Sequence, residues 1–153
     1  MKDVLQGVIR RLKADAAIVA FGSPAIGTRI YRTIPITPQH PFIACARIDG
    51  PPSPSESSET GTWGTARIQC TTFTIPTSPG DADSFELSEL IANCLSTQRD
   101  GGIQNDYLDP GSPKDLIFVS EIEDLGPIPD NSDAATTGEY RDNRDFIVHY
   151  QVE

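Results

Sequence analysis

The chain has 153 residues, of which 37% are hydrophobic, and a formal net charge of −10. This length predicts a single domain over residues 1–153, large enough to bury a core without disulfides or metal ions. The acidic excess disfavours non-specific binding to nucleic acid, which requires neutralisation of phosphates, and without a run of about 18 apolar residues we predict no membrane contact.

The N-terminal quarter predicts one helix, one short strand and a stiff connector. Apolar residues recur at helical spacing from Val4 to Val19, and Gly22 and the Ser-Pro pair after it end the pattern. A short strand is expected over residues 29–34. Prolines at 35, 38 and 41 then predict an extended connector or an edge, since proline cannot sit inside a central strand.

Two alternating segments, residues 42–49 and 62–75, predict a long hairpin. The flexible loop predicted between them, residues 50–61, is rich in Pro, Ser and Glu and has no apolar residue that could join a core. Two interpretations of this loop remain open: it is a docking arm that orders on contact with a partner, or it is a tolerated insertion.

The second half of the chain predicts a helix and two strands. Asp83 and Glu86 fit a capping box, and the apolar residues after them recur at helical spacing up to Leu95. Residues 98–115 are expected to be loop, 116–125 a strand, 126–138 a second loop and 140–152 the last strand. The order α-β-β-β-α-β-β indicates an α+β fold, with one mostly antiparallel sheet flanked by two helices, a long hairpin and mobile loops.

No reaction centre is apparent in the sequence. The motifs G-x-S-x-G, G-x-x-x-x-G-K and G-x-G-x-x-G do not occur, and neither His40 nor His149 lies in the context of a nucleophile. The three cysteines lie far apart, without C-x-x-C spacing, and are expected to be buried thiols. We therefore predict no catalytic residue, no cofactor and no metal ion.

Charge is distributed unevenly along the chain. Residues 1–47 carry seven Lys or Arg and two acids, a balance of +5, whereas residues 48–153 carry five Lys or Arg and 20 acids, a balance of −15. This split has two interpretations: a solvated acidic surface, or copies that meet head-to-tail, basic segment against acidic segment, in a ring.

Several segments together resemble a known family. These are the opening helix with Asp15-Ala16-Ala17, the Arg29-Ile30-Tyr31 strand after Gly27, Phe42-Ile43 after the prolines, Arg67-Ile68-Gln69, and the closing Arg144-Asp145-Phe146-Ile147-Val148. In this diffuse pattern the chain resembles the tail completion, or tail terminator, family of long-tailed bacteriophages over nearly its whole length. The loop at 50–61 and the acidic stretch at 121–145 depart from the family in length.

The resemblance implies a structural virion protein, made in the host cytoplasm and located in the neck of the tail. Copies would form a ring, expected to be a hexamer, that caps the head-proximal end of the tail tube and ends tube polymerisation. The partners implied are the tail tube protein and the connector or stopper protein of the head. The genome would pass the bore without specific binding, which an acidic lining favours.

Two alternatives remain: another neck component, such as a head-completion or connector-stopper protein, and a small soluble α+β enzyme or ligand-binding domain. Trp63 is either a core residue or an anchor for a partner. The residues expected to contact partners come from the basic segment, the loop and its base, and the acidic C-terminal part: Arg10, Lys13, Arg29, Arg32, Pro51, Ser53, Glu56, Glu59, Trp63, Asp130, Asp133 and Glu139.

Overall fold

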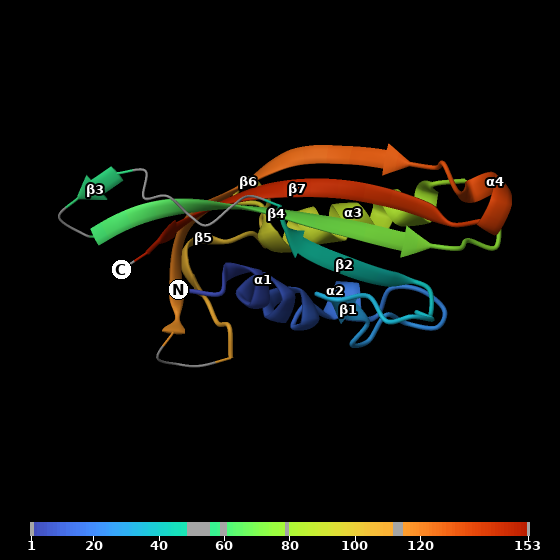
Figure 1. Cartoon of the computed structure of the whole chain (residues 1–153), viewed down its shortest axis with the longest axis horizontal. Helices are drawn as coiled ribbons and strands as arrows, with labels where there is room; N and C mark the ends of the chain where they lie inside the picture. The colour runs from blue at the N-terminus through green and yellow to red at the C-terminus, as the bar shows by residue number, and fades with distance from the viewer. Residues whose placement is uncertain (1, 49–55, 59–60, 79, 112–114, 153) are drawn as a thin grey trace.

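The structure, a computed structural model, describes residues 2–48, 56–58, 61–78, 80–111 and 115–152. In these residues seven strands form one sheet in the order β1-β2-β4-β7-β6-β5, and β3 pairs with one end of β4 (Figure 1). The strands are β1 (Ile30–Tyr31), β2 (Phe42–Arg47), β3 (Glu56–Ser58), β4 (Gly61–Thr74), β5 (Gln104–Leu108), β6 (Ile117–Asp130) and β7 (Tyr140–Gln151). The helices described are α1 (Val4–Lys13), α2 (Ala16–Val19), α3 (Ala82–Leu95) and α4 (Ala134–Thr137).

The sheet is built around the long strands β4, β7 and β6, which run antiparallel to one another. The predicted hairpin is confirmed: β2 pairs antiparallel with β4, and Cys45 lies opposite Cys70. Only the short pair β1–β2 is parallel. The α+β class and the mostly antiparallel sheet are therefore confirmed.

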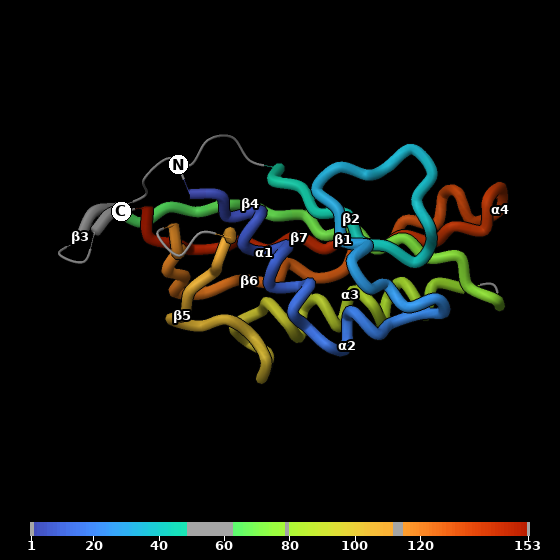
Figure 2. Tube along the Cα trace, turned by 90° about the horizontal axis from the view of Figure 1, so that it is seen from below, coloured from blue at the N-terminus to red at the C-terminus, as the bar shows by residue number. Residues whose placement is uncertain are grey.

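Helices α1, α2 and α3 cover one face of this sheet (Figure 2). Their apolar side chains pack against alternate strand residues to form one core, which includes Leu12, Ile91, Ile68 and Phe146. Alternation along β7 places Phe146, Val148 and Tyr150 in this core, as predicted from the period of two. The three cysteines are free and buried, also as predicted.

No described helix covers the opposite face of the sheet (Figure 1). In the middle of the sheet this face carries mainly polar side chains, such as Gln69 and Thr71 on β4 and Asn143 on β7. Thr71 donates a hydrogen bond to Asn143 Oδ1 over 2.8 Å, and Arg67 pairs with Asp145 over 2.7 Å. An antiparallel sheet can leave such a face to water or to another protein.

The single helix predicted for residues 4–19 is two helices. α1 ends at Lys13, and the side chain of Asp15 accepts a hydrogen bond from the backbone N–H of Ile18 to start α2. Aspartate competes with the helical backbone in this way and so favours caps over helix interiors. The apolar spacing continues across the break because both helices lie on the same core.

The predicted cap of the second helix is also wrong. α3 begins after Asp81, two residues before the predicted Asp83, and its N-cap side chain makes no capping bond. Ser84 instead donates a hydrogen bond to the carbonyl oxygen of Asp81. The burial of Ser84 and Leu87 fixes the first turn, so packing rather than a capping box sets this end of the helix.

Two segments predicted as loops contain strands. β5 lies within residues 98–115, and β6 continues to Asp130 through Pro127 and Pro129. β5 covers β6 only as far as Glu121, so both prolines lie on a stretch that pairs with β7 alone. Proline is tolerated there because the missing N–H belongs to the open edge. The rest of the second predicted loop contains the short helix α4.

The predicted flexible loop at residues 50–61 contains β3 and the first residue of β4. Backbone pairing joins Glu56 to Trp63 and Ser58 to Gly61. Strand pairing therefore extends the hairpin beyond the apolar alternation, and the flexibility of the loop stays a prediction. Residues 49–55 and 59–60, with Pro51, Ser53 and Glu59, lie outside the described residues.

Candidate functional site

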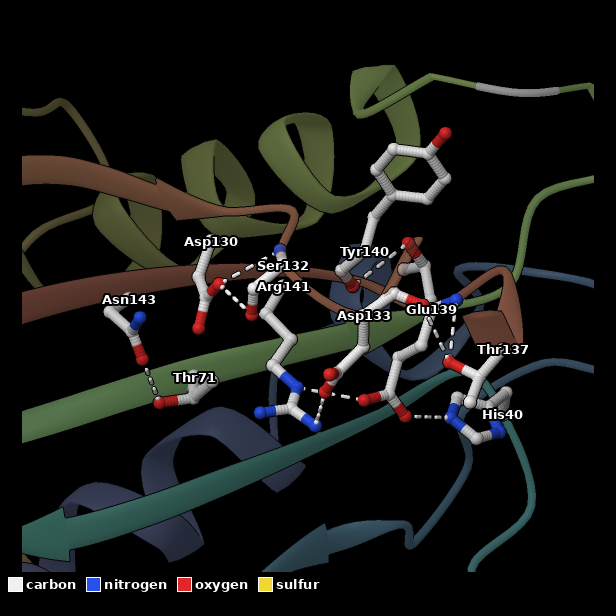
Figure 3. Close-up of polar contacts among 11 residues, drawn as sticks. His40, Thr71, Asp130, Ser132, Asp133, Thr137, Glu139, Tyr140, Arg141 and Asn143 are labelled. Carbon is white, nitrogen blue, oxygen red and sulfur yellow. Dashed lines mark hydrogen bonds and ion pairs between the residues drawn. The ribbon is translucent and has the colours of Figure 1, made fainter. Parts of the chain in front are cut away.

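Three of the acids predicted to contact partners come together at one end of the molecule. Asp130, Asp133 and Glu139 surround Arg141 beside α4, and His40 reaches them from the connector before β2 (Figure 3). We call these five residues the α4 corner. Arg141 donates to Glu139 Oε1 over 2.7 Å and to Asp133 Oδ2 over 2.6 Å, and His40 Nε2 lies 2.6 Å from Glu139 Oε2.

The pKa directions at the α4 corner follow from these contacts. Burial acts to raise the pKa of Glu139, but hydrogen bonds from His40 and Arg141 outweigh it and hold that pKa below its ordinary value. The bond to Glu139 raises the pKa of Arg141. Hydrogen bonds from Ser132 lower the pKa of Asp130. The three acids outnumber the one arginine, so the α4 corner carries a net negative charge at neutral pH.

Aromatic packing fixes the α4 corner on the uncovered face of the sheet. The rings of Phe42 and Phe73 stack with their centroids 4.5 Å apart, and the guanidinium carbon of Arg141 lies 5.2 Å from the centroid of Phe73. The rings of His40 and Phe42 pack edge-to-face, with their centroids 5.1 Å apart. The charges therefore project from a rigid base, not from a loose loop.

The basic residues predicted on the first helix lie at a second surface. Arg10 and Lys13 line a shallow hollow of about 410 Å³ between α1 and β5, together with Arg11. We call these three residues and the hollow the basic hollow. Gly7 lets α1 approach β5 closely, since a Cβ there would meet Leu108 Cβ at 3.0 Å. Asp109 lies 3.9 Å from Arg10, so one acid only partly offsets the three cations.

The other predicted contact residues are separated from these two surfaces. Arg29 donates hydrogen bonds to the backbone oxygens of Pro24 and Pro41. Its side chain therefore joins the loop after α2 to the connector before β2. Arg32 pairs with Asp3 over 2.7 Å. Trp63 is half-buried and packs edge-to-face with Phe118, which makes it neither a core residue nor a fully exposed anchor. Glu56 lies on β3.

One set of metal-ligating side chains occurs in the described part of the chain. Donor atoms of Glu121, Glu123 and His149 lie within 4.8 Å of one another on β6 and β7. His149 Nε2 already lies 2.7 Å from Glu123 Oε1, and both glutamates are exposed. This geometry is that of a hydrogen bond between side chains at the surface. The sequence did not predict it, because the strand pairing that brings these residues together has no local signal.

The groups that could act as nucleophiles or bases are poorly placed for catalysis. A hydrogen bond from Cys45 and burial raise the pKa of the Cys70 thiol, and burial raises the pKa of Cys94 to about 12. Thiols of this kind stay protonated at neutral pH and are weak nucleophiles. His149 is half-buried on β7, and its Nε2 lies 2.7 Å from Glu123 Oε1.

Sequence reasoning found the acids of the α4 corner but missed His40 and Arg141, which bind them. His40 and Glu139 are separated by 99 positions, so only the sheet brings them together. The alternation of β7, which places Arg141 on the uncovered face, was the one available signal.

Comparison with known proteins gives a likeness of fold. No family model matches the chain, and no curated protein matches it. Among solved structures, a chain from the "Virion of native gene transfer agent (GTA) particle" shares the fold with a TM-score of 0.64 and 18% identity, over 95% of this chain and 93% of that chain. In the described residues, no helix is both long enough and apolar enough to cross a membrane.

Proposed function

We propose that this protein is a structural component of a phage-like virion and acts without covalent chemistry. The observation that carries the proposal is the likeness of fold to a virion chain, which extends over nearly the full length of both chains. The sequence resemblance to tail terminators supports the same class. The buried, protonated thiols and the hydrogen bond between His149 and an exposed glutamate favour assembly over catalysis.

Within this class, we propose the tail terminator role. Copies form a ring, expected to be hexameric, at the head-proximal end of the tail tube, where the ring ends tube polymerisation and binds the head connector. The charge arrangement supports such a ring, since the basic hollow and the acidic α4 corner lie on separate surfaces of one copy. Rigid, oppositely charged surfaces set partner choice and orientation in assembly.

Imaging of the purified protein tests the ring. We expect electron microscopy and native mass spectrometry to show a closed ring of identical copies. A protein that stays monomeric up to its solubility limit, with or without tail tubes, would contradict the terminator role.

Deletion of the gene in the cell that makes the particles tests the position in the neck. Loss of a terminator leaves tube growth unchecked and should give tubes of irregular, excessive length. Loss of a head-completion or connector-stopper protein should instead give tails of normal length that remain detached from heads. That second result would assign the protein to another neck position.

A further inference from the structure

A second acidic surface, not predicted from the sequence, lies at the start of α3. Asp81, Asp83 and Glu86 are exposed there, and none of them forms an ion pair with another described residue. Phe85, between them, is 46% exposed, although it is a large apolar side chain. We call these four residues the acidic helix start. This surface therefore combines an exposed aromatic ring with carboxylates that no described cation neutralises.

The basic hollow is the complement of this surface on the same molecule. It presents Arg10, Arg11 and Lys13 around an apolar floor that includes Gly7 and Leu108. No described acid lies within ion-pair distance of Lys13. The acids of the helix start and the cations of the basic hollow are therefore largely unpaired among the described residues of one copy. The two surfaces carry opposite charges.

The two surfaces cannot meet within one copy. α1 and β5 lie toward one end of the long axis, whereas the first turn of α3 lies toward the other end, next to the end of β4 (Figures 1 and 2). A contact between the two surfaces must therefore join different copies. Because the surfaces differ, that contact is head-to-tail, which gives a ring when the rotation between copies closes.

We propose that the acidic helix start of one copy docks into the basic hollow of the next, with Phe85 against the apolar floor and its flanking carboxylates on Arg10 and Lys13. This inference rests on the proposed ring and names the contact that builds it. Desolvated opposite charges around an aromatic anchor are typical of the energetically important centre of an interface.

A second copy fits the hollow better than nucleic acid does. The floor of the hollow is apolar at Gly7 and Leu108, and a phosphate backbone offers it no apolar group. An acidic helix face with an aromatic ring brings both the charge and the apolar surface that the hollow accepts.

Charge reversal on each surface tests the contact. Arg10→Glu with Lys13→Glu changes only the hollow, and Asp83→Lys with Glu86→Lys changes only the helix start. Each protein alone should lose rings and self-associate about 100-fold more weakly in native mass spectrometry. A mixture of the two should recover rings of alternating copies, since each contact between the variants again joins surfaces of opposite charge, and a chain with all four reversals should recover rings by itself.

Two controls separate loss of docking from loss of folding. Glu121→Lys reverses an exposed charge on the uncovered sheet face and should leave ring formation unchanged. The neutral variants Arg10→Gln with Lys13→Gln and Asp83→Asn with Glu86→Gln disturb the helix ends less and should still weaken assembly. Far-UV circular dichroism should give the same secondary-structure content for the neutral variants as for the parent.

The outcomes distinguish this inference from the proposed function. Rings that persist in both reversal variants, or a reversed-charge chain that stays monomeric, would overturn the inference and leave the ring itself standing. A parent protein that forms no ring would contradict both. Binding of duplex DNA that is lost with Arg10→Glu and Lys13→Glu while rings persist would assign the hollow to nucleic acid instead.

Discussion

Arg144 on β7 reaches Glu89 on α3 across the core face of the sheet, with Nη2 of the arginine 2.7 Å from Oε2 of the glutamate. The guanidinium is 2% exposed, and its Nη1 donates a hydrogen bond to Asp124 over 3.0 Å. Arg99 approaches the same two acids. A strand, its neighbour and the covering helix are thus joined through one buried cation.

Removal of both acids should cost more stability than removal of the arginine. Glu89→Gln with Asp124→Asn leaves a buried guanidinium without either of its ion-pair partners, and we expect a loss of about 3–5 kcal/mol in the free energy of unfolding. Arg144→Met leaves two acids that still contact water and Arg99, and we expect a loss of roughly 1–2 kcal/mol. Urea denaturation of the three proteins measures the difference. The reverse order of stability would show that the arginine mainly fills space.

Phe146→Ala should destabilise the protein by about 3–5 kcal/mol, because the ring is fully buried and its loss leaves a cavity between β7 and the helices. The matched control is Ile147→Ala, one residue along, on the uncovered face and half-buried. We expect it to cost less than half as much. Thermal unfolding checks both, and a melting temperature for Phe146→Ala within a degree of the parent would contradict the assignment of this face.

The α4 corner should make stability depend on acid pH. The folded-state pKa of Glu139 lies below its ordinary value, so the unfolded chain binds a proton there more readily. Its contribution is full above about pH 4.3, the unfolded value, and is lost as pH falls through the folded pKa.

We therefore expect Glu139→Gln to lower the free energy of unfolding by about 1–2 kcal/mol at pH 6.5, a difference that narrows below pH 4. Urea titrations at several pH values measure it. Glu121→Gln, an exposed glutamate on the uncovered face, serves as the control with little effect at either pH. If the free energies of unfolding of Glu139→Gln and the parent differ by the same amount at every pH, the carboxylate charge of Glu139 is unimportant.

The trio of Glu121, Glu123 and His149 should not act as a metal site. His149 Nε2 lies 2.7 Å from Glu123 Oε1 and 3.9 Å from Glu121 Oε1, an uneven spacing with one direct hydrogen bond, whereas ligands of a tetrahedral zinc lie about 3.4 Å apart, as follows from bonds near 2.1 Å. We expect added Zn²⁺ to leave the melting temperature unchanged. A rise that disappears in His149→Ala would contradict this and add a metal ion to the protein.

The sequence alone determined the elements whose periodicity reflects burial on one face. Alternation along β4 and β7 predicted which residues enter the core, and the helical spacing from Leu87 to Leu95 predicted α3. These predictions succeeded because a side chain's position on a strand or helix follows from the local repeat. The α+β class follows from the same elements.

Tertiary structure decided what depends on neighbours distant in the chain. Pro127 and Pro129 indicated a loop, yet they lie in a strand because only β7 pairs with that stretch of β6. The local repeat of the sequence does not distinguish an edge strand from a central strand, since the difference is whether another strand lies alongside. For the same reason, only the folded sheet brings His40 to Glu139, buries Arg144 against Glu89, and leaves the acids at the start of α3 without an ion-pair partner among the described residues.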